Sequence, residues 1–262
     1  MTTTIAPTPR LAPLAAEATL IRRSIIHTIA SPDALVMSVA LPIALMLMFT
    51  YVFGGAIDRT GDYVNYVVPG IILLCAGFGS SSTAVSVSSD MTNGVIDRFR
   101  TMRFRSSAVI TGHVVASLLR NLLATGVVIG IAFAVGFRPG GDLLGWVAAV
   151  GLLALYILGI TYVFAAIGVV SSSPDAAMGY GFILLFLPYV SSAFVPVETM
   201  PEWLQGFAQH QPLTPIIETV RGLLTGAAVG DEGVVAIAWC AGILVIGVAL
   251  SSVLFSRRAG RR

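Results

Sequence analysis

The sequence predicts an all-α integral membrane protein that crosses the bilayer six times. Of its 262 residues, 56% are hydrophobic and only 11% are charged, whereas a soluble domain has about 25% charged residues. Six apolar runs each reach the roughly 20 residues that a helix needs to cross about 30 Å of hydrocarbon. Arginine-rich polar segments lie between and beside these runs, and their distribution predicts how the chain is oriented.

The N-terminal part is expected to lie outside the hydrocarbon. Residues 1–13 contain no apolar core, which predicts a disordered tail and no signal peptide. Residues 14–30 mix apolar side chains with Glu17, Arg22 and Arg23 and stop at a Ser-Pro-Asp break. This pattern predicts an interfacial helix that lies on the membrane before the first span.

The third apolar run contains an arginine, Arg120. An arginine at a span centre costs about 2.5–3.5 kcal/mol, which roughly ten Leu, Ile, Val and Phe residues at about 0.3–0.6 kcal/mol each offset. We expect its side chain to snorkel to the cytoplasmic headgroups, with a charge lining a pathway as the alternative. Gly126 and Gly130 form a GxxxG that predicts close helix packing. The six predicted spans are 34–55, 64–89, 114–137, 143–170, 176–195 and 233–255.

The arginines predict the orientation. With six spans both termini share one side, and that side holds three arginines before the first span, four in segment 90–113 and four in the C-terminal tail. The opposite side holds only Arg59, Arg138 and Arg221. By the positive-inside rule, both termini and segment 90–113 are cytoplasmic.

Segment 90–113 is predicted to contain an amphipathic helix. Val95, Ile96, Phe99 and Met102 recur at helical spacing, while the charged residues fall mostly on the remaining arc. Such a helix rests on anionic headgroups or docks into a groove on a partner protein. A basic loop that only sets the topology is the alternative.

The segment 196–232 is apolar and aromatic, but four prolines divide it into pieces too short to span. We expect two short helices, 201–209 and 214–224, that dip into the outer leaflet as a re-entrant pair. Glu218 and Arg221 stand three residues apart and are expected to neutralise each other.

Several function classes are disfavoured by what the sequence lacks. All fifteen basic residues are arginine, so the phosphate-binding lysine of a P-loop ATPase and a Schiff-base lysine are both missing. The net charge of +2 does not indicate a nucleic-acid partner. Cys75 and Cys240 lie in apolar runs and are expected to pack as small hydrophobes, with no metal. The predicted spans contain no histidine, HExxH, GxSxG or paired carboxylates, which disfavours a membrane enzyme.

Four segments resemble a known family: DYVNYVVPGIIL at 62–73, NGVIDRFRTM at 93–102, FVPVETMPEWLQGFAQHQPLTP at 194–215, and the break at 31–33. Together with the six-span layout they resemble the type-2 ABC exporter permeases, especially the actinobacterial daunorubicin-resistance (multidrug efflux) branch. The resemblance covers nearly the whole chain and implies one transmembrane permease domain over 1–262.

In that family, the segment that matches 90–113 carries a coupling helix that docks on a separate ATP-binding subunit. The family commonly has a proline after the position that matches Met102, where this chain has Arg103, so the end of the helix stays open. The coupling residues that the resemblance implies are Gly94, Val95, Ile96, Asp97, Arg98, Phe99, Arg100 and Met102.

The resemblance also implies a complex in a bacterial plasma membrane. It would contain two copies of this chain, or this chain with a sister permease, and two ATPase subunits that bind ATP and Mg. Its function would be ATP-driven export of hydrophobic or amphipathic compounds such as a drug, an antibiotic or a lipid. A permease for a polysaccharide or teichoic-acid precursor and a non-transporting scaffold or sensor subunit are the alternatives. The candidate pathway residues, for which ordinary interhelical packing is the other interpretation, are Asn65, Tyr66, Phe78, Phe186 and Tyr189.

Overall fold

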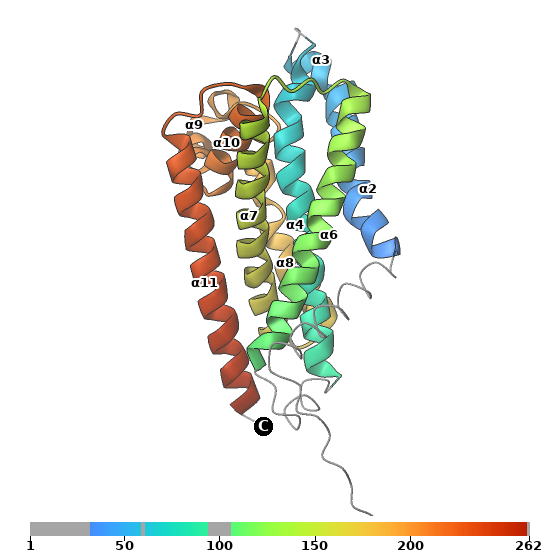
Figure 1. Ribbon diagram of the computed structural model, residues 1–262, viewed down its shortest axis with the longest axis vertical. Helices are drawn as coiled ribbons and strands as arrows, with labels where there is room; N and C mark the ends of the chain where they lie inside the picture. Colours follow the sequence, from blue (N-terminus) through green and yellow to red (C-terminus); the bar gives the residue numbers. More distant parts are fainter. Residues whose placement is uncertain (1–31, 59–60, 94–105, 261–262) are drawn as a thin grey trace, which may run out of the picture.

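The computed structural model describes residues 32–58, 61–93 and 106–260, and in these ranges every regular element is a helix (Figure 1). Five helices are long and apolar enough to cross a membrane. The predicted class, an all-α protein with several membrane-crossing helices, is therefore confirmed for the described residues. The tail 1–13, the interfacial helix 14–30 and the coupling residues between 94 and 102 lie outside them.

The long helices form an elongated bundle around α4. α4 packs against α2, α6, α7 and α8, so every residue from 67 to 77 is buried. At 1.5 Å per residue, helices of 28–30 residues rise about 42–45 Å, which exceeds the hydrocarbon thickness. The elements that correspond to five of the predicted spans are α2 (Pro32–Met48) with the π-turn η1 (Phe49–Phe53) and α3 (Gly54–Ile57), α4 (Tyr63–Thr92), α6 (Ser106–Val135), α7 (Leu143–Val170) and α11 (Glu232–Gly260).

The remaining predicted span, 176–195, is wrong as a single transmembrane helix. α8 (Pro174–Leu184) has 11 residues and rises only about 16 Å. A 3-10 turn, η2 (Leu187–Val190), and irregular backbone follow it. Pro188 explains the break, because its ring clashes with the carbonyl of the residue four positions earlier, which is the last residue of α8.

Two short helices occur where the sequence predicts them. α9 (Glu202–His210) and α10 (Leu213–Thr225) follow the 3-10 turn η3 (Val197–Thr199), and both lie at the same end of the bundle (Figure 1). α10 packs against α4, α7 and α11 and buries its apolar side in the main core. We call this end the distal end, and we call the end where α4 stops and α6 begins the basal end.

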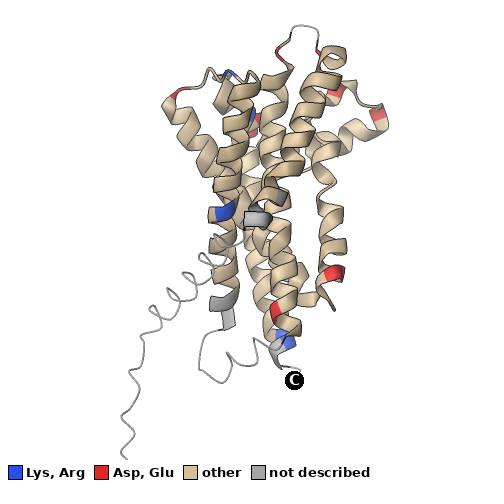
Figure 2. Ribbon diagram, turned by 90° about the vertical axis from the view of Figure 1, so that its right-hand side faces the viewer, with Lys and Arg blue, Asp and Glu red and all other residues tan. Residues whose placement is uncertain are grey.

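Charged residues are sparse along the middle of the bundle. In Figure 2 the basic and acidic residues gather towards the two ends, and the ribbons between them are almost entirely uncharged. The charge distribution and the helix lengths agree with a bundle whose middle lies in hydrocarbon.

Glycines allow the closest helix contacts. A Cβ added to Gly168 of α7 would lie 2.4 Å from the backbone oxygen of Ala84 in α4. By contrast, a Cβ added to Gly126 or Gly130 would meet no described atom within 4 Å. The close packing that this GxxxG predicts is therefore not formed with another described helix of the chain.

Replacing Gly168 tests this packing. Gly168→Ala should destabilise the bundle by about 1–3 kcal/mol, because backbone must move to relieve the overlap. The apparent melting temperature in mild detergent should fall accordingly.

Gly151→Ala is the matched control, since it lies in the same helix and its added Cβ meets nothing within 4 Å. It should be neutral or slightly stabilising, because alanine is the better helix former. Equal melting temperatures for the two variants would contradict the contact.

Candidate functional site

The backbone between α8 and η3 is largely non-helical, and part of this segment lies inside the bundle. Ala193 of this segment packs on Gly70, where an added Cβ would lie 2.6 Å from the Ala193 backbone. Gly70 comes seven residues after Tyr63, the first residue of α4, and so lies about 10 Å from the distal end of that helix. Non-helical backbone at such a depth is tolerated only where protein or water satisfies its polar groups.

Side chains satisfy the carbonyls that the break exposes. The Gln211 amide, between α9 and α10, donates to the backbone oxygens of Val190 at 2.9 Å and Leu187 at 3.3 Å. The Ser191 hydroxyl donates to the oxygen of Pro188 at 2.6 Å. Gln211 and Ser191 thus provide hydrogen bonds that a continuous helix would have provided itself.

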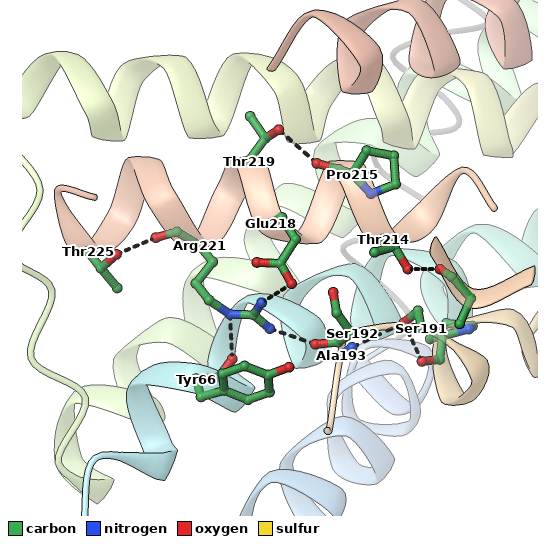
Figure 3. Close-up of polar contacts among 12 residues, drawn as sticks. Tyr66, Ser191, Ser192, Ala193, Thr214, Pro215, Glu218, Thr219, Arg221 and Thr225 are labelled. Carbon is green, nitrogen blue, oxygen red and sulfur yellow. Dashed lines mark hydrogen bonds and ion pairs between the residues drawn. The ribbon is translucent and has the colours of Figure 1, made fainter. Parts of the chain in front are cut away.

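Arg221 of α10 adds a further contact to the broken segment and also contacts α4 (Figure 3). Its Nη2 donates to the backbone oxygen of Ser192 at 2.7 Å, and its Nε donates to that of Tyr66 at 3.1 Å. The guanidinium also lies 3.8 Å from the centre of the Tyr66 ring and 2.5 Å from a carboxylate oxygen of Glu218. The predicted Glu218–Arg221 pair is confirmed, and the same guanidinium joins α10, α4 and the broken segment.

A continuous row of aromatic rings runs along the break. Neighbouring rings have centroids 4.3 to 6.1 Å apart, and the two central pairs are stacked at 18° and 26°. Such geometry is typical of favourable aromatic contacts. Four of the six rings are exposed. This aromatic row consists of Phe182, Phe186, Tyr189, Phe194, Phe49 and Phe53.

The structure brings together only two of the five candidate pathway residues. Phe186 and Tyr189 lie next to each other in the aromatic row. Asn65 accepts a hydrogen bond from the Arg138 backbone N–H at 2.8 Å at the distal end of α4. Tyr66 lies under Arg221, and Phe78 is partly buried against the core.

Sequence reasoning missed the other members of the aromatic row. Phe182 and Phe186 stand four residues apart, a spacing that indicates contact on one helix face. The stacking of Phe194 on Phe49 joins positions far apart in the chain, so no local pattern indicates it.

At the basal end, a contact between two side chains joins α4 to α6 next to the predicted coupling segment. A ring nitrogen of His113 lies 2.8 Å from a carboxylate oxygen of Asp90. Residues 94–105, which connect the two helices, lie outside the described ranges. Arg258 of α11 also donates to the backbone oxygens of Val169 and Ser171, which ties α11 to the end of α7.

Comparison with protein families gives a match to the model of the ABC-2 type transporter over residues 16–225. The chain belongs to this family. The ABC-2 match includes the broken segment, α9, α10 and the predicted coupling residues. An ABC-2 permease is a membrane subunit, so an ATPase subunit is its implied partner.

Relatives of this ABC-2 permease support the same assignment. The chain is 35% identical over 199 residues to the daunorubicin resistance ABC transporter permease protein DrrB1 of Streptomyces coeruleorubidus, covering 75% of this chain and 70% of the relative. It is 25% identical over 211 residues to the probable doxorubicin resistance ABC transporter permease protein DrrC of Mycobacterium tuberculosis, covering 80% and 76%. It is 24% identical over 212 residues to the putative transport permease ycf38 of Cyanophora paradoxa, covering 78% and 72%. The resemblance seen in the sequence is confirmed.

Removing Arg221 tests whether its contacts hold the distal region of the permease together. Arg221→Ala leaves the buried Ser192 carbonyl, which lies outside any helix, without this donor, and a buried acceptor left unpaired costs about 1–3 kcal/mol. The apparent melting temperature of the purified permease should therefore fall by several degrees.

Glu218→Gln is the control, because an amide oxygen can still accept from Arg221 and the Glu218 side chain is 37% exposed. Its effect should stay below about 1 kcal/mol, as for exposed ion pairs. If both variants lost the same stability, the ion pair and not the carbonyl contacts would hold α10 in place.

Proposed function

We propose that this ABC-2 permease is the membrane subunit of an ATP-driven exporter that carries hydrophobic or amphipathic compounds out of the cell. The aromatic row is the observation that carries the proposal. Exposed rings beside a broken helix offer an apolar, polarisable surface for an aromatic or amphipathic molecule. Discontinuous helices are also common at substrate sites of other transporters.

The relatives favour a drug or antibiotic as the transported compound. Two of them are named for daunorubicin or doxorubicin resistance. No observation favours a polysaccharide or teichoic-acid precursor, and family membership favours a transporter subunit over a scaffold or sensor.

The proposed topology has six crossings in a bacterial plasma membrane. α8, η2 and the irregular residues up to η3 together form the fifth crossing, because they lead from the basal end of α7 to the distal end. α9 and α10 form the re-entrant pair in the outer leaflet. Both termini and segment 90–113 are cytoplasmic, which the arginine distribution supports.

The complex would contain two permeases, either two copies of this chain or this chain with a sister permease, and two ATPase subunits that hold ATP and Mg. Closure of the ATPase subunits would push on the coupling residues Gly94 to Met102. The Asp90–His113 contact would make α4 and α6 move together. The movement would rock the permeases between inward-facing and outward-facing states.

The coupling assignment predicts that replacing Asp97 and Arg98 together, as D97N with R98A, abolishes export while the protein stays in the membrane. ATP-dependent daunorubicin movement in inverted vesicles containing the ATPase subunit is the measurement. Arg257→Gln serves as the control, because it removes an exposed basic residue near the same end. Export at the parental rate by the double variant would refute these residues as the coupling contact.

The aromatic row predicts that Phe186→Ala or Tyr189→Ala raises the KM for exported daunorubicin. Aromatic contacts contribute about 0.5–1.5 kcal/mol each, so each variant should raise KM about twofold to tenfold.

Phe133→Ala is the matched control, since Phe133 is 40% exposed and pairs with Phe137 and Trp146 outside the row. Its KM should equal that of the parent. An equal rise in KM for all three variants would argue for a general packing defect and against a substrate surface.

A further inference from the structure

Arg120 lies at mid-depth in the bundle. It stands 14 residues after Ser106 and 15 before Val135, the two ends of α6, which places its Cα about 21–22 Å from each end of the helix. The expectation that it snorkels to the headgroups does not agree with the structure. Its Nη2 instead donates to the backbone oxygen of Gly79 at 3.1 Å and to the Ser82 hydroxyl at 2.5 Å, both in the middle of α4.

The Arg120 guanidinium has donors that no described residue of the chain accepts. A guanidinium has five N–H groups, and the two described hydrogen bonds of Arg120 both come from Nη2. Within 32–58, 61–93 and 106–260, no carboxylate lies at ion-pair distance from Arg120. A cation at this depth without a counter-charge is costly, so a mid-membrane arginine normally faces a partner or an aqueous path.

A polar path leads from Arg120 to the basal end. Ser86, Ser89 and Asp90 follow Ser82 on one face of α4, at spacings of four, seven and eight residues. Ser86 is exposed, and the other three are partly exposed. His113 of α6 contacts Asp90 at the bottom of the same seam. We call these residues, with Arg120 at the top, the polar seam.

The surface of α6 between Arg120 and the distal end is apolar, in contrast to the polar seam. Leu123 and Val127 lie three and seven residues after Arg120, on the same side of α6, and are 60% and 51% exposed. Gly126 and Gly130 leave open space beside them. One side of the α4–α6 pair is therefore polar below Arg120 and apolar above it.

A buried polar layer next to Arg120 joins α6 to α4 and α7. The Asn121 amide donates to the hydroxyls of Ser80 at 3.1 Å and Ser117 at 3.3 Å, and Thr161 of α7 donates to Ser80 at 3.0 Å. A Cβ at Gly79 would lie 1.6 Å from the Asn121 side-chain oxygen, so any larger residue there would displace the Asn121 side chain. These contacts fix the register of α6 against α4 and keep Arg120 directed to the seam.

We infer that Arg120 binds the oxyanion, a carboxylate or a phosphate, of an acidic amphiphile whose tail lies along the apolar distal half of α6. The free N–H groups match an oxyanion, and the change from polar to apolar surface at Arg120 matches a molecule with an acidic head and an apolar tail. Taking a transported compound as the ligand rests on the proposed export function. The headgroup of an anionic phospholipid offers the same chemistry.

The test measures binding to the full-length permease in phosphatidylcholine nanodiscs. The probe is dodecanoate labelled with a fluorophore at its chain end, and the comparison probe is the same chain ending in an alcohol. The acid should bind more tightly than the alcohol. Arg120→Gln should weaken acid binding about tenfold, the typical effect of losing a charged hydrogen bond, and leave alcohol binding unchanged.

Arg138→Gln is the matched control, because Arg138 also donates to two backbone carbonyls but lies at the distal end. It should bind both probes as the parent does. Phosphatidylglycerol added to the nanodiscs separates the two ligand sources: displacement of the acid probe assigns the site to lipid headgroups, and retention of the probe assigns it to a free acidic amphiphile.

Equal affinity of the parent for acid and alcohol, or equal acid affinity of the parent and Arg120→Gln, would overturn the inference. Should Arg120→Gln not fold, Ser86→Leu gives a second test. It places an apolar side chain across the polar seam and should slow association of the acid probe, whereas an unchanged rate would count against the site. The binding assay needs neither the ATPase subunit nor transport. Failure of the export proposal would therefore show in a different assay, as the absence of ATP-dependent drug movement in vesicles.

Discussion

Backbone carbonyls cannot remain without hydrogen-bond partners inside a membrane protein, and the distal half of this permease is arranged around that constraint. Pro188 ends α8 within the bundle and leaves the following carbonyls without helical partners. Gln211 and Arg221 supply donors to them, and Tyr63 adds one to the oxygen of Phe194 at 2.7 Å. The break therefore requires α9 and α10 to lie where they do, because Gln211 and Arg221 can donate to these carbonyls only from hydrogen-bond distance.

The same break brings the aromatic rings together. A continuous helix would keep Phe186 and Tyr189 on one face but would turn Phe194 about 140° away from Tyr189, since each residue turns the chain by about 100°. The short turns after α8 instead place these rings in sequence and stack Phe194 on Phe49. The feature that costs backbone hydrogen bonds therefore also creates the apolar surface proposed for the substrate.

α4 connects this distal region to the basal end. Its distal half is buried and mostly apolar, whereas its basal half carries the serines of the polar seam and ends near Asp90. Arg221 contacts the first half and Arg120 the second. A force applied at the basal end would reach both regions through one rigid helix, which is the kind of element that rigid-body transport movements require.

Hydropathy determined the membrane class and the five long helices, and the absence of lysine showed that the chain has no P-loop lysine, because helix length and composition can be read directly from the sequence. Proline spacing likewise indicated α9 and α10. The number of apolar residues in 176–195 wrongly predicted one continuous transmembrane helix, because it took no account of Pro188, which ends α8. Only the tertiary structure decided which carbonyls Arg221 and Gln211 satisfy, which rings stack, and that Arg120 binds α4 instead of the headgroups. The carbonyl contacts and the Phe49–Phe194 stack join residues 21 to 155 positions apart, and their formation depends on three-dimensional packing that no local pattern of residues contains.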